Sequence, residues 1–280
     1  MPELPEVESV RRIMSRVLKG HRIVKAEIVP DDIIFYGVDA KAIESSLVGR
    51  TVTEVGRRGK YWWLELDEKP WLFGHLGMSG WIRELGASTV RLKEHGNAPL
   101  DDETGRPRFL KMLLETEKGG KIAFTDARRL GRVWLVDDPV KDRRLKKLGP
   151  DTYHELPSVE ALFKTLHSRK APIKALLLDQ SLFAGVGNWV ADEVLYHAHL
   201  SPKRLGSSLK EGEVEKLRKA IEDVLHLAVE VGADSEKYPK GWLFHHRWGG
   251  GRGAEIIDGK SIVREPVGGR TTAWVPDVQK

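Results

Sequence analysis

The chain contains no cysteine among its 280 residues. It therefore has no disulfide bonds and no thiolate ligands for a metal, and this absence fits an intracellular protein. Long apolar runs are missing too. No segment approaches the roughly 18 apolar residues that span a membrane, and the start lacks the hydrophobic stretch of a secretory signal. We therefore expect no disulfide framework and no membrane association.

The charge of the chain is modestly positive. Lysine and arginine number 46 against 41 acidic residues, which gives a net charge of +5, and the pI is about 9.2. This balance favours a polyanionic partner but does not identify one, because local basic patches matter more than the total. The length suits one large or two medium domains with sizeable cores.

The first half of the chain has the pattern of one helix followed by β-strands. Apolar residues between positions 7 and 18 recur at helical spacing, and Gly20 provides a stop. Short strands separated by Gly, Asp and Pro then predict an antiparallel sandwich or barrel, with an irregular loop over residues 93–107. The expected strands cover residues 23–29, 51–55, 61–66, 71–76, 80–83, 109–114, 121–125 and 132–136.

After residue 138 the pattern becomes helical. Helices are expected over residues 158–167, 172–179, 188–199 and 209–231. Near the end, Asp258-Gly259 separates two short strand-like runs at 254–257 and 260–263, which predicts a tight hairpin. The fold class is therefore α+β, divided into a β-sandwich domain at 1–138, a helical domain at 139–239 and a terminal hairpin at 240–280.

The chain opens with an unusual concentration of reactive groups. Removal of the initiator methionine would make Pro2 the terminus, and its amine would have a pKa of about 7.7–8 against about 10.4 for lysine. Such an amine can attack an electrophilic carbon and form a Schiff base, while Glu3 and Glu6 supply proton donation and charge stabilisation. A plainer interpretation is that Pro5 begins a helix whose first turn carries acidic residues. That interpretation does not account for Pro2 or Glu3.

Four later motifs combine flexible turns with basic or apolar side chains. They are Arg57-Arg58-Gly59-Lys60, His75-Leu76-Gly77-Met78-Ser79-Gly80, Thr125-Asp126-Ala127-Arg128-Arg129-Leu130-Gly131 and Phe183-Ala184-Gly185-Val186-Gly187-Asn188-Trp189. Each has an ordinary explanation as a solvated strand end, a core methionine, a charged β-turn or an interhelical turn. The last motif also places Asn188 at a helix start, where backbone N–H groups suit a phosphate.

The opening Pro2-Glu3-Leu4-Pro5-Glu6-Val7-Glu8 resembles the start of the formamidopyrimidine-DNA glycosylase family, the Fpg/Nei glycosylases. The four later motifs extend the similarity over essentially the whole chain. The resemblance implies an N-terminal helix with an antiparallel β-sandwich, then a helix–two-turns–helix domain that ends in a finger-like β-hairpin. It implies that Pro2, Glu3, Glu6 and Lys60 form the catalytic site, with Lys60 on a phosphate beside the reacting sugar.

The same resemblance implies which residues contact DNA. Met78 would fill the space left by an extruded nucleotide, and Arg128 would contact the orphaned partner base. Leu130 departs from the family pattern, which has phenylalanine, so the strength of helix disruption and the opposite-base preference are in question. The remaining DNA contacts implied by the family motifs are Arg129, Lys174, Gly187, Asn188 and Arg270. Glu193 is expected to be an internal structural carboxylate.

The C-terminal segment departs further from the family. It is similar to the family's terminal zinc finger, but Val275 and Val278 stand where two cysteines would bind the metal, and the other cysteine pair is missing. No metal site and no cofactor are therefore expected. Apolar packing of Ile256, Ile262, Val275 and Val278 would close the hairpin instead, as in the zincless branch known from plant and fungal members.

The resemblance implies a monomeric bifunctional glycosylase and abasic-site lyase of base excision repair. Its partner would be double-stranded DNA with oxidised bases or abasic sites, in the nucleus of a eukaryote or the cytoplasm and nucleoid of a bacterium. The short segment at 234–239 implies formamidopyrimidines and hydantoins ahead of 8-oxoguanine. Two alternatives remain at this point: a catalytically inactive binder of damaged DNA, and a hydrolytic nuclease with a divalent metal on Glu3 and Glu6.

Overall fold

A computed structural model describes residues 2–87, 101–249 and 256–280 of the chain. The chain forms two compact units, residues 1–146 with 232–235, and residues 147–231 with 236–280. The first boundary thus lies eight residues after the expected one. The terminal residues from 240 onward belong to the helical unit, whereas the sequence suggested a separate section. In the described part of the chain, no helix is long and apolar enough to cross a membrane.

The first unit begins with helix α1 (Leu4–Leu18), as expected from its apolar spacing. Pro5 lies in the first turn, where its missing N–H costs no hydrogen bond, and Gly20 follows the helix end with a φ of +79°. One face of α1 is buried and contributes to the core through Val7, Val10, Met14, Val17 and Leu18.

Two four-stranded antiparallel sheets form a β-sandwich, which confirms the predicted architecture and all eight expected strands. One sheet has the order β1 (Ile23–Ile28), β6 (Leu110–Thr116), β7 (Lys121–Asp126), β5 (Gly80–Glu84). The other has the order β2 (Val52–Arg58), β3 (Tyr61–Leu66), β4 (Trp71–His75), β8 (Arg132–Val136). Side chains from both sheets share one apolar core.

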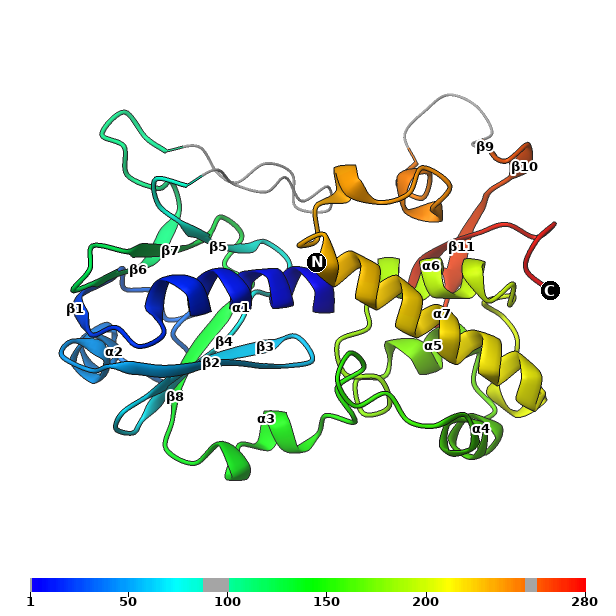
Figure 1. Cartoon of the computed structure of the whole chain (residues 1–280), viewed down its shortest axis with the longest axis horizontal. Coiled ribbons are helices and arrows are strands. Elements are labelled where there is room, and N and C mark those ends of the chain that lie inside the picture. The colour runs from blue at the N-terminus through cyan, green and yellow to red at the C-terminus, as the bar shows by residue number, and fades with distance from the viewer. Residues whose placement is uncertain (1, 88–100, 250–255) are drawn as a thin grey trace. The chain divides into compact units, whose positions relative to one another are not determined.

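Helix α1 packs against β2 and β5, which are edge strands of the two different sheets. In Figure 1 it runs between them, so it covers one open side of the sandwich. Helix α2 (Ala40–Leu47), which the sequence pattern did not reveal, packs against β1 through Ile43 and Leu47. The short helices η1 (Pro139–Lys141) and α3 (Arg143–Lys146) end this part of the chain.

The second unit contains the four expected helices, each within about two residues of its predicted bounds. They are α4 (Val159–His167), α5 (Ile173–Leu178), α6 (Asn188–His197) and α7 (Glu211–Glu230). Helix α7 packs against α4 and α6, and the connections include the short helices η2 (Gly206–Ser208), η3 (Ser235–Lys237) and η4 (Leu243–His245).

Two hairpins follow the helices. Strands β9 (Ile256–Ile257) and β10 (Lys260–Ser261) flank Asp258 and Gly259, whose φ values of +48° and +75° match the predicted tight turn. Residues 254 and 255, expected in the first strand, lie outside the described residues. The second hairpin, β11 (Val263–Val267) with β12 (Arg270–Trp274), packs on α6.

The apolar closure of this region is confirmed in kind and corrected in one residue. Leu243, Ile257, Ile262, Ala273 and Val275 form a buried cluster, with Val278 partly buried against it. Ile256, expected in that cluster, is 56% exposed. Neighbouring residues of a strand point to opposite faces, so only one of the two isoleucines can face inward, and that residue is Ile257.

Candidate active site

The start of α1 gathers the three N-terminal residues that the sequence singled out. Pro2, Glu3 and Glu6 are all buried in this unit. The Glu6 carboxylate accepts the backbone N–H of Glu3 at 3.0 Å, as the partner residue of a capping box. The helix therefore holds both carboxyl groups beside the residue whose amine would be the nucleophile.

The environment of Glu6 changes its acidity. Burial raises the pKa of Glu6 to about 7, and the nearby Glu3 carboxylate contributes in the same direction. A carboxyl group with a pKa near the working pH can hold a proton or release it. The helix start thus holds two nearby carboxyl groups, and the pKa of one of them, Glu6, lies near neutrality.

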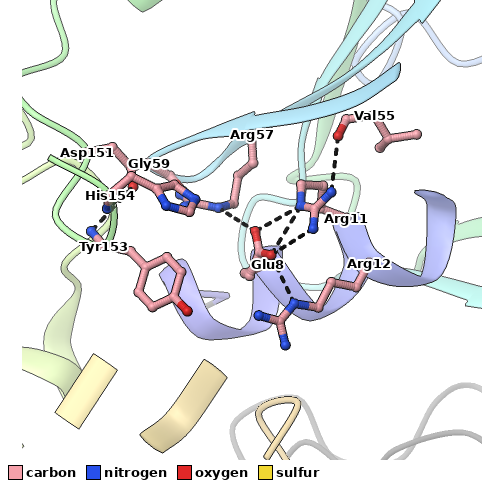
Figure 2. A network of polar contacts seen from close by, with 9 residues as sticks. All are labelled: Glu8, Arg11, Arg12, Val55, Arg57, Gly59, Asp151, Tyr153 and His154. Carbon is pink, nitrogen blue, oxygen red and sulfur yellow. Dashed lines mark hydrogen bonds and ion pairs between the residues drawn. The ribbon is translucent and has the colours of Figure 1, made fainter. Parts of the chain in front are cut away.

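A buried ion pair ties α1 to the turn that carries Lys60. The Glu8 carboxylate accepts hydrogen bonds from Arg57 at 3.0 Å and also from Arg11 and Arg12 (Figure 2). Arg57 in turn donates to the carbonyl of Gly59 at 2.9 Å. Because this contact lies one residue before Lys60, it positions the turn between β2 and β3 against the helix.

Lys60 itself is only 7% exposed, so its turn presents the side chain within the unit. The charge of Lys60 also affects His75, at the end of β4. Burial lowers the pKa of His75 to about 4, and the positive charges of Lys60 and Arg132 add to the effect. His75 is therefore neutral at physiological pH, and its Nδ1 accepts the N–H of Gly77 at 2.9 Å.

Two apolar side chains project from neighbouring loops. Met78, between β4 and β5, is 41% exposed, and Leu130, between β7 and β8, is 36% exposed. The two loops touch, because a Cβ atom placed on Gly77 would lie 2.2 Å from the carbonyl oxygen of Leu130. Arg128 is exposed on the second loop. The structure thus brings Met78, Arg128 and Leu130 to one place.

The next arginine, Arg129, is placed differently. It has a φ of +56°, and its guanidinium donates to both carboxylate oxygens of Asp31, at 2.9 and 3.0 Å. Asp31 also binds Lys111 at 2.8 Å, and these partners hold the pKa of the Asp31 carboxyl well below its usual range. Arg129 therefore anchors its own loop to the sandwich.

In the second unit, α6 begins beside the tip of the β11–β12 hairpin. The side-chain amide of Asn188 donates to the carbonyl of Thr271 at 2.9 Å, and Gly187 caps the helix. The Asn188 Oδ1 has no hydrogen-bond partner among the residues described. Arg270, one residue before Thr271, is exposed. The structure thus brings Gly187, Asn188 and Arg270 together.

Lys174 does not join this group, which corrects its expected role. Its side chain is fully buried, where the ammonium pairs with Asp192 and donates to the carbonyl of Asn188 at 2.8 Å. The Lys174 ammonium is thus engaged by groups of the protein and supports the start of α6 from within. Glu193 is internal as expected, since its carboxylate accepts the N–H groups of Leu243 and Phe244.

The C-terminal hairpins do not fit a metal ion. Val275 and Val278 occupy the positions of two metal-binding cysteines in the family pattern, and they lie in or against the apolar cluster. Within the described ranges, no group of three or more His, Asp or Glu side chains is arranged to hold a metal. The residues present therefore supply packing where zinc ligands would be needed.

Sequence reasoning missed the supporting residues of these sites. Glu8 was seen only as an acidic residue near a helix start, and Asp31 was not singled out. Asp126 belonged to a motif but had no assigned role, although its carboxylate binds both projecting loops. An acidic residue within an otherwise basic motif is the sequence signal that could have pointed to it.

Comparison with known proteins agrees with this architecture. Residues 1–133 match the family model of the formamidopyrimidine-DNA glycosylase N-terminal domain, and residues 148–239 match the formamidopyrimidine-DNA glycosylase H2TH domain. A formamidopyrimidine-DNA glycosylase of Arabidopsis thaliana is 39% identical over 280 residues, which cover all of this chain and 71% of that protein. One from Pelotomaculum thermopropionicum is 32% identical over 295 residues, covering 100% and 99%.

Solved structures are similar over the whole chain. The Lactococcus lactis formamidopyrimidine-DNA glycosylase, non-covalently bound to DNA with an abasic site, gives a TM-score of 0.79 at 27% identity and covers 99% of each chain. MutM in complex with DNA containing carbocyclic 8-oxoguanine gives 0.80 at 26% identity and covers 100% of both chains.

Proposed function

The chain belongs to the formamidopyrimidine-DNA glycosylase family, and from that premise we propose that it is a bifunctional DNA glycosylase and abasic-site lyase of base excision repair. One observation carries the proposal. Pro2, Glu3 and Glu6 are buried together at the start of α1, where Glu6 binds the N–H of Glu3. A secondary amine beside two carboxyl groups is the set of functional groups that Schiff-base chemistry on a sugar requires.

The proposed reaction begins once Pro2 is the N-terminal residue. Its nitrogen attacks the anomeric carbon of the damaged nucleotide, and the bond from that carbon to the base breaks. The departing base takes the proton that the Pro2 nitrogen loses, Glu3 protonates the sugar ring oxygen, and the ring opens to a Schiff base. Loss of a proton from the adjacent sugar carbon expels the 3′ phosphate, and a second elimination expels the 5′ phosphate, which leaves a one-nucleotide gap. Water then hydrolyses the Schiff base, which releases the sugar remnant and restores the Pro2 amine. Glu6 orients Glu3 and the helix start.

We propose double-stranded DNA with oxidised bases or abasic sites as the partner of the monomeric protein. A base inside a duplex must leave the stack before chemistry on its nucleotide, at a cost of a few kcal/mol. Met78, Arg128 and Leu130 project where they would occupy the vacated space. Lys60, Gly187, Asn188 and Arg270 would hold phosphates, while Arg129 supports its loop through Asp31.

Among lesions, we propose that formamidopyrimidines and hydantoins are excised ahead of 8-oxoguanine. The argument is the short connection between α7 and η4, which includes η3 and a buried Tyr238 and leaves little length for a base-capping loop. Excision rates on matched duplexes that differ only in the lesion test this order. Fastest removal of 8-oxoguanine would overturn it.

Borohydride trapping on an abasic-site duplex, in chelator, tests the central proposal. The intact mass is recorded first to establish that Pro2 is the terminus. We expect a covalent adduct that disappears when the N-terminal amine is blocked or when Pro2 is replaced by glycine. No adduct from protein that begins at Pro2 would indicate a DNA-binding relative without chemistry. Strand cleavage that requires a divalent metal would indicate a hydrolytic nuclease.

A further inference from the structure

The two loops that carry Met78 and Leu130 share a single buried carboxylate. Asp126, the last residue of β7, is 1% exposed. Its Oδ1 accepts the hydroxyl of Ser79 at 2.5 Å, which belongs to the Met78 loop. Its Oδ2 accepts the N–H of Gly131 at 2.7 Å, at the far end of the Leu130 loop. The same side chain therefore bonds to both loops at once.

The backbone of the second loop is held at its near end as well. Asp126 Oδ1 also accepts the N–H of Arg128 at 3.2 Å. The sheet fixes the position of Asp126, because this residue pairs with Gly80 of the neighbouring strand β5 and its N–H donates to the carbonyl of Phe109 at 3.0 Å. The carboxylate thus lies on the rigid sheet and bonds to residues on each side of Leu130.

Direct backbone packing adds a second constraint. Gly77 has a φ of +63°, and any Cβ there would meet the Leu130 carbonyl carbon at 2.3 Å. Only glycine allows this approach without a shift of one loop. The Met78 loop therefore lies directly on the Leu130 loop, and its freedom to move independently is small.

From this geometry we infer that Asp126 is a positioning residue that couples the Met78 and Leu130 loops. The Met78 and Leu130 side chains then enter a damaged duplex together, in a fixed arrangement. The inference rests on the proposed function, because it concerns how the duplex is opened. Side chains locked by buried hydrogen bonds insert without the entropy cost of ordering two loops separately. Asp126 does not touch DNA in this scheme and takes no part in the chemistry at Pro2.

The coupling predicts a specific pattern of loss. Opening of the duplex depends on the Met78 and Leu130 side chains. An abasic sugar in single-stranded DNA is already accessible, so Pro2 can attack it without any strand separation. Removal of the Ser79 hydroxyl takes one hydrogen bond from the Asp126 carboxyl group, an effect of about tenfold on excision from a duplex. Cleavage of the single-stranded abasic substrate should not change.

The test compares Ser79→Ala with Ser79→Thr, which keeps the hydroxyl, and with Ser46→Ala. The Ser46 hydroxyl, on the exposed face of α2, donates to the carbonyl of Ala42 in its own helix. Three quantities are measured: excision from a lesion duplex, fluorescence of 2-aminopurine beside the lesion, and cleavage of single-stranded abasic DNA. Asp126→Asn is added with a thermal melt, because that variant can lose stability for structural reasons.

We expect Ser79→Ala to lower duplex excision and the 2-aminopurine signal together while single-stranded cleavage persists, and Ser79→Thr and Ser46→Ala to match wild type. Equal losses on both substrates would overturn the coupling and indicate a general structural role. Wild-type duplex opening in Ser79→Ala would also overturn it. Failure of wild-type protein to cut single-stranded abasic DNA would contradict the proposed function, so the two failures are distinguishable.

Discussion

The Glu8 carboxylate and the Arg57 guanidinium form an ion pair at 3.0 Å, with both side chains at most 3% exposed. The pair joins α1 to the end of β2. Because α1 carries Pro2, Glu3 and Glu6 while the β2–β3 turn carries Lys60, this contact sets the distance between the two parts of the candidate site. Arg11 and Arg12 bind the same carboxylate from the helix. Burial opposes ionisation of Glu8, but the Arg11 and Arg57 guanidinium groups hold the pKa of Glu8 below its usual value.

We expect Arg57→Met to lower the free energy of unfolding by about 3 kcal/mol, because it removes one partner of a buried ion pair. Denaturant unfolding measures this change. Lys219→Met, which removes an exposed pair with Asp223 on α7, is the matched control and should leave the free energy of unfolding nearly unchanged. Equal effects of the two substitutions would show that the buried pair contributes nothing beyond a surface pair.

Glu6 should make stability depend on pH. Its pKa is raised to about 7 from 4.5, so the folded protein binds this proton more tightly than the unfolded chain. The stabilisation is complete below pH 4.5 and is lost as the pH rises through 7, a change on the order of 3 kcal/mol. Glu6→Gln removes the ionisation. Its melting temperature relative to wild type should therefore be higher at pH 8 than at pH 5.

Glu215→Gln, at an exposed position of α7, controls for the substitution itself. Thermal melts of the three proteins at both pH values suffice. A Glu6→Gln variant whose difference from wild type is the same at pH 5 and pH 8 would show that Glu6 does not titrate in this range.

Arg270 and Lys174 should separate binding from stability. Arg270→Ala removes an exposed cation beside Asn188. We expect an unchanged melting temperature, weaker duplex binding, and a slope of log K against log salt reduced by about 0.9, the value for one phosphate contact. Binding isotherms at several salt concentrations measure this slope. An unchanged slope would show that Arg270 does not contact a phosphate.

Lys174→Met should behave in the opposite way. It leaves the buried Asp192 carboxylate paired with Arg247 but without the Lys174 ammonium, so we expect a loss of several kcal/mol in unfolding free energy. Denaturant unfolding measures the loss. If the Lys174→Met protein is as stable as wild type but binds DNA more weakly, Lys174 contributes to DNA binding after all.

Leu130→Phe tests the departure from the family pattern. A phenylalanine ring stacks on bases, which is worth about 1–3 kcal/mol per base, whereas leucine only separates them. We expect the variant to bind lesion duplexes about tenfold more tightly and to discriminate differently among opposite bases. Affinities on duplexes with each of the four opposite bases measure both effects. If the leucine and phenylalanine proteins behave alike, the ring is not used at this position.

The secondary structure was largely determined by local patterns. Short runs separated by Gly, Asp and Pro predicted all eight strands of the sandwich, and helical spacing predicted α1 and the helices of the second unit. Helix α2 was missed, because its eight residues bury only Ile43 and Leu47 and carry little periodic signal. The choice between Ile256 and Ile257 failed for a related reason: alternation gives two faces but does not say which one meets the core.

For the candidate site, too, the sequence determined some features and the tertiary structure decided others. The sequence by itself determined the chemical groups, since a proline at position 2, two glutamates and the basic and glycine-rich turns are covalent facts of the chain. Only the tertiary structure decided which charges are available. Lys174 and Arg129 looked as free as Arg128 and Arg270, yet Asp192 and Asp31 engage them. Those acidic partners lie 18 and 98 residues away in the chain. The energy of a charge depends on its burial and its nearest opposite charge, and folding sets both.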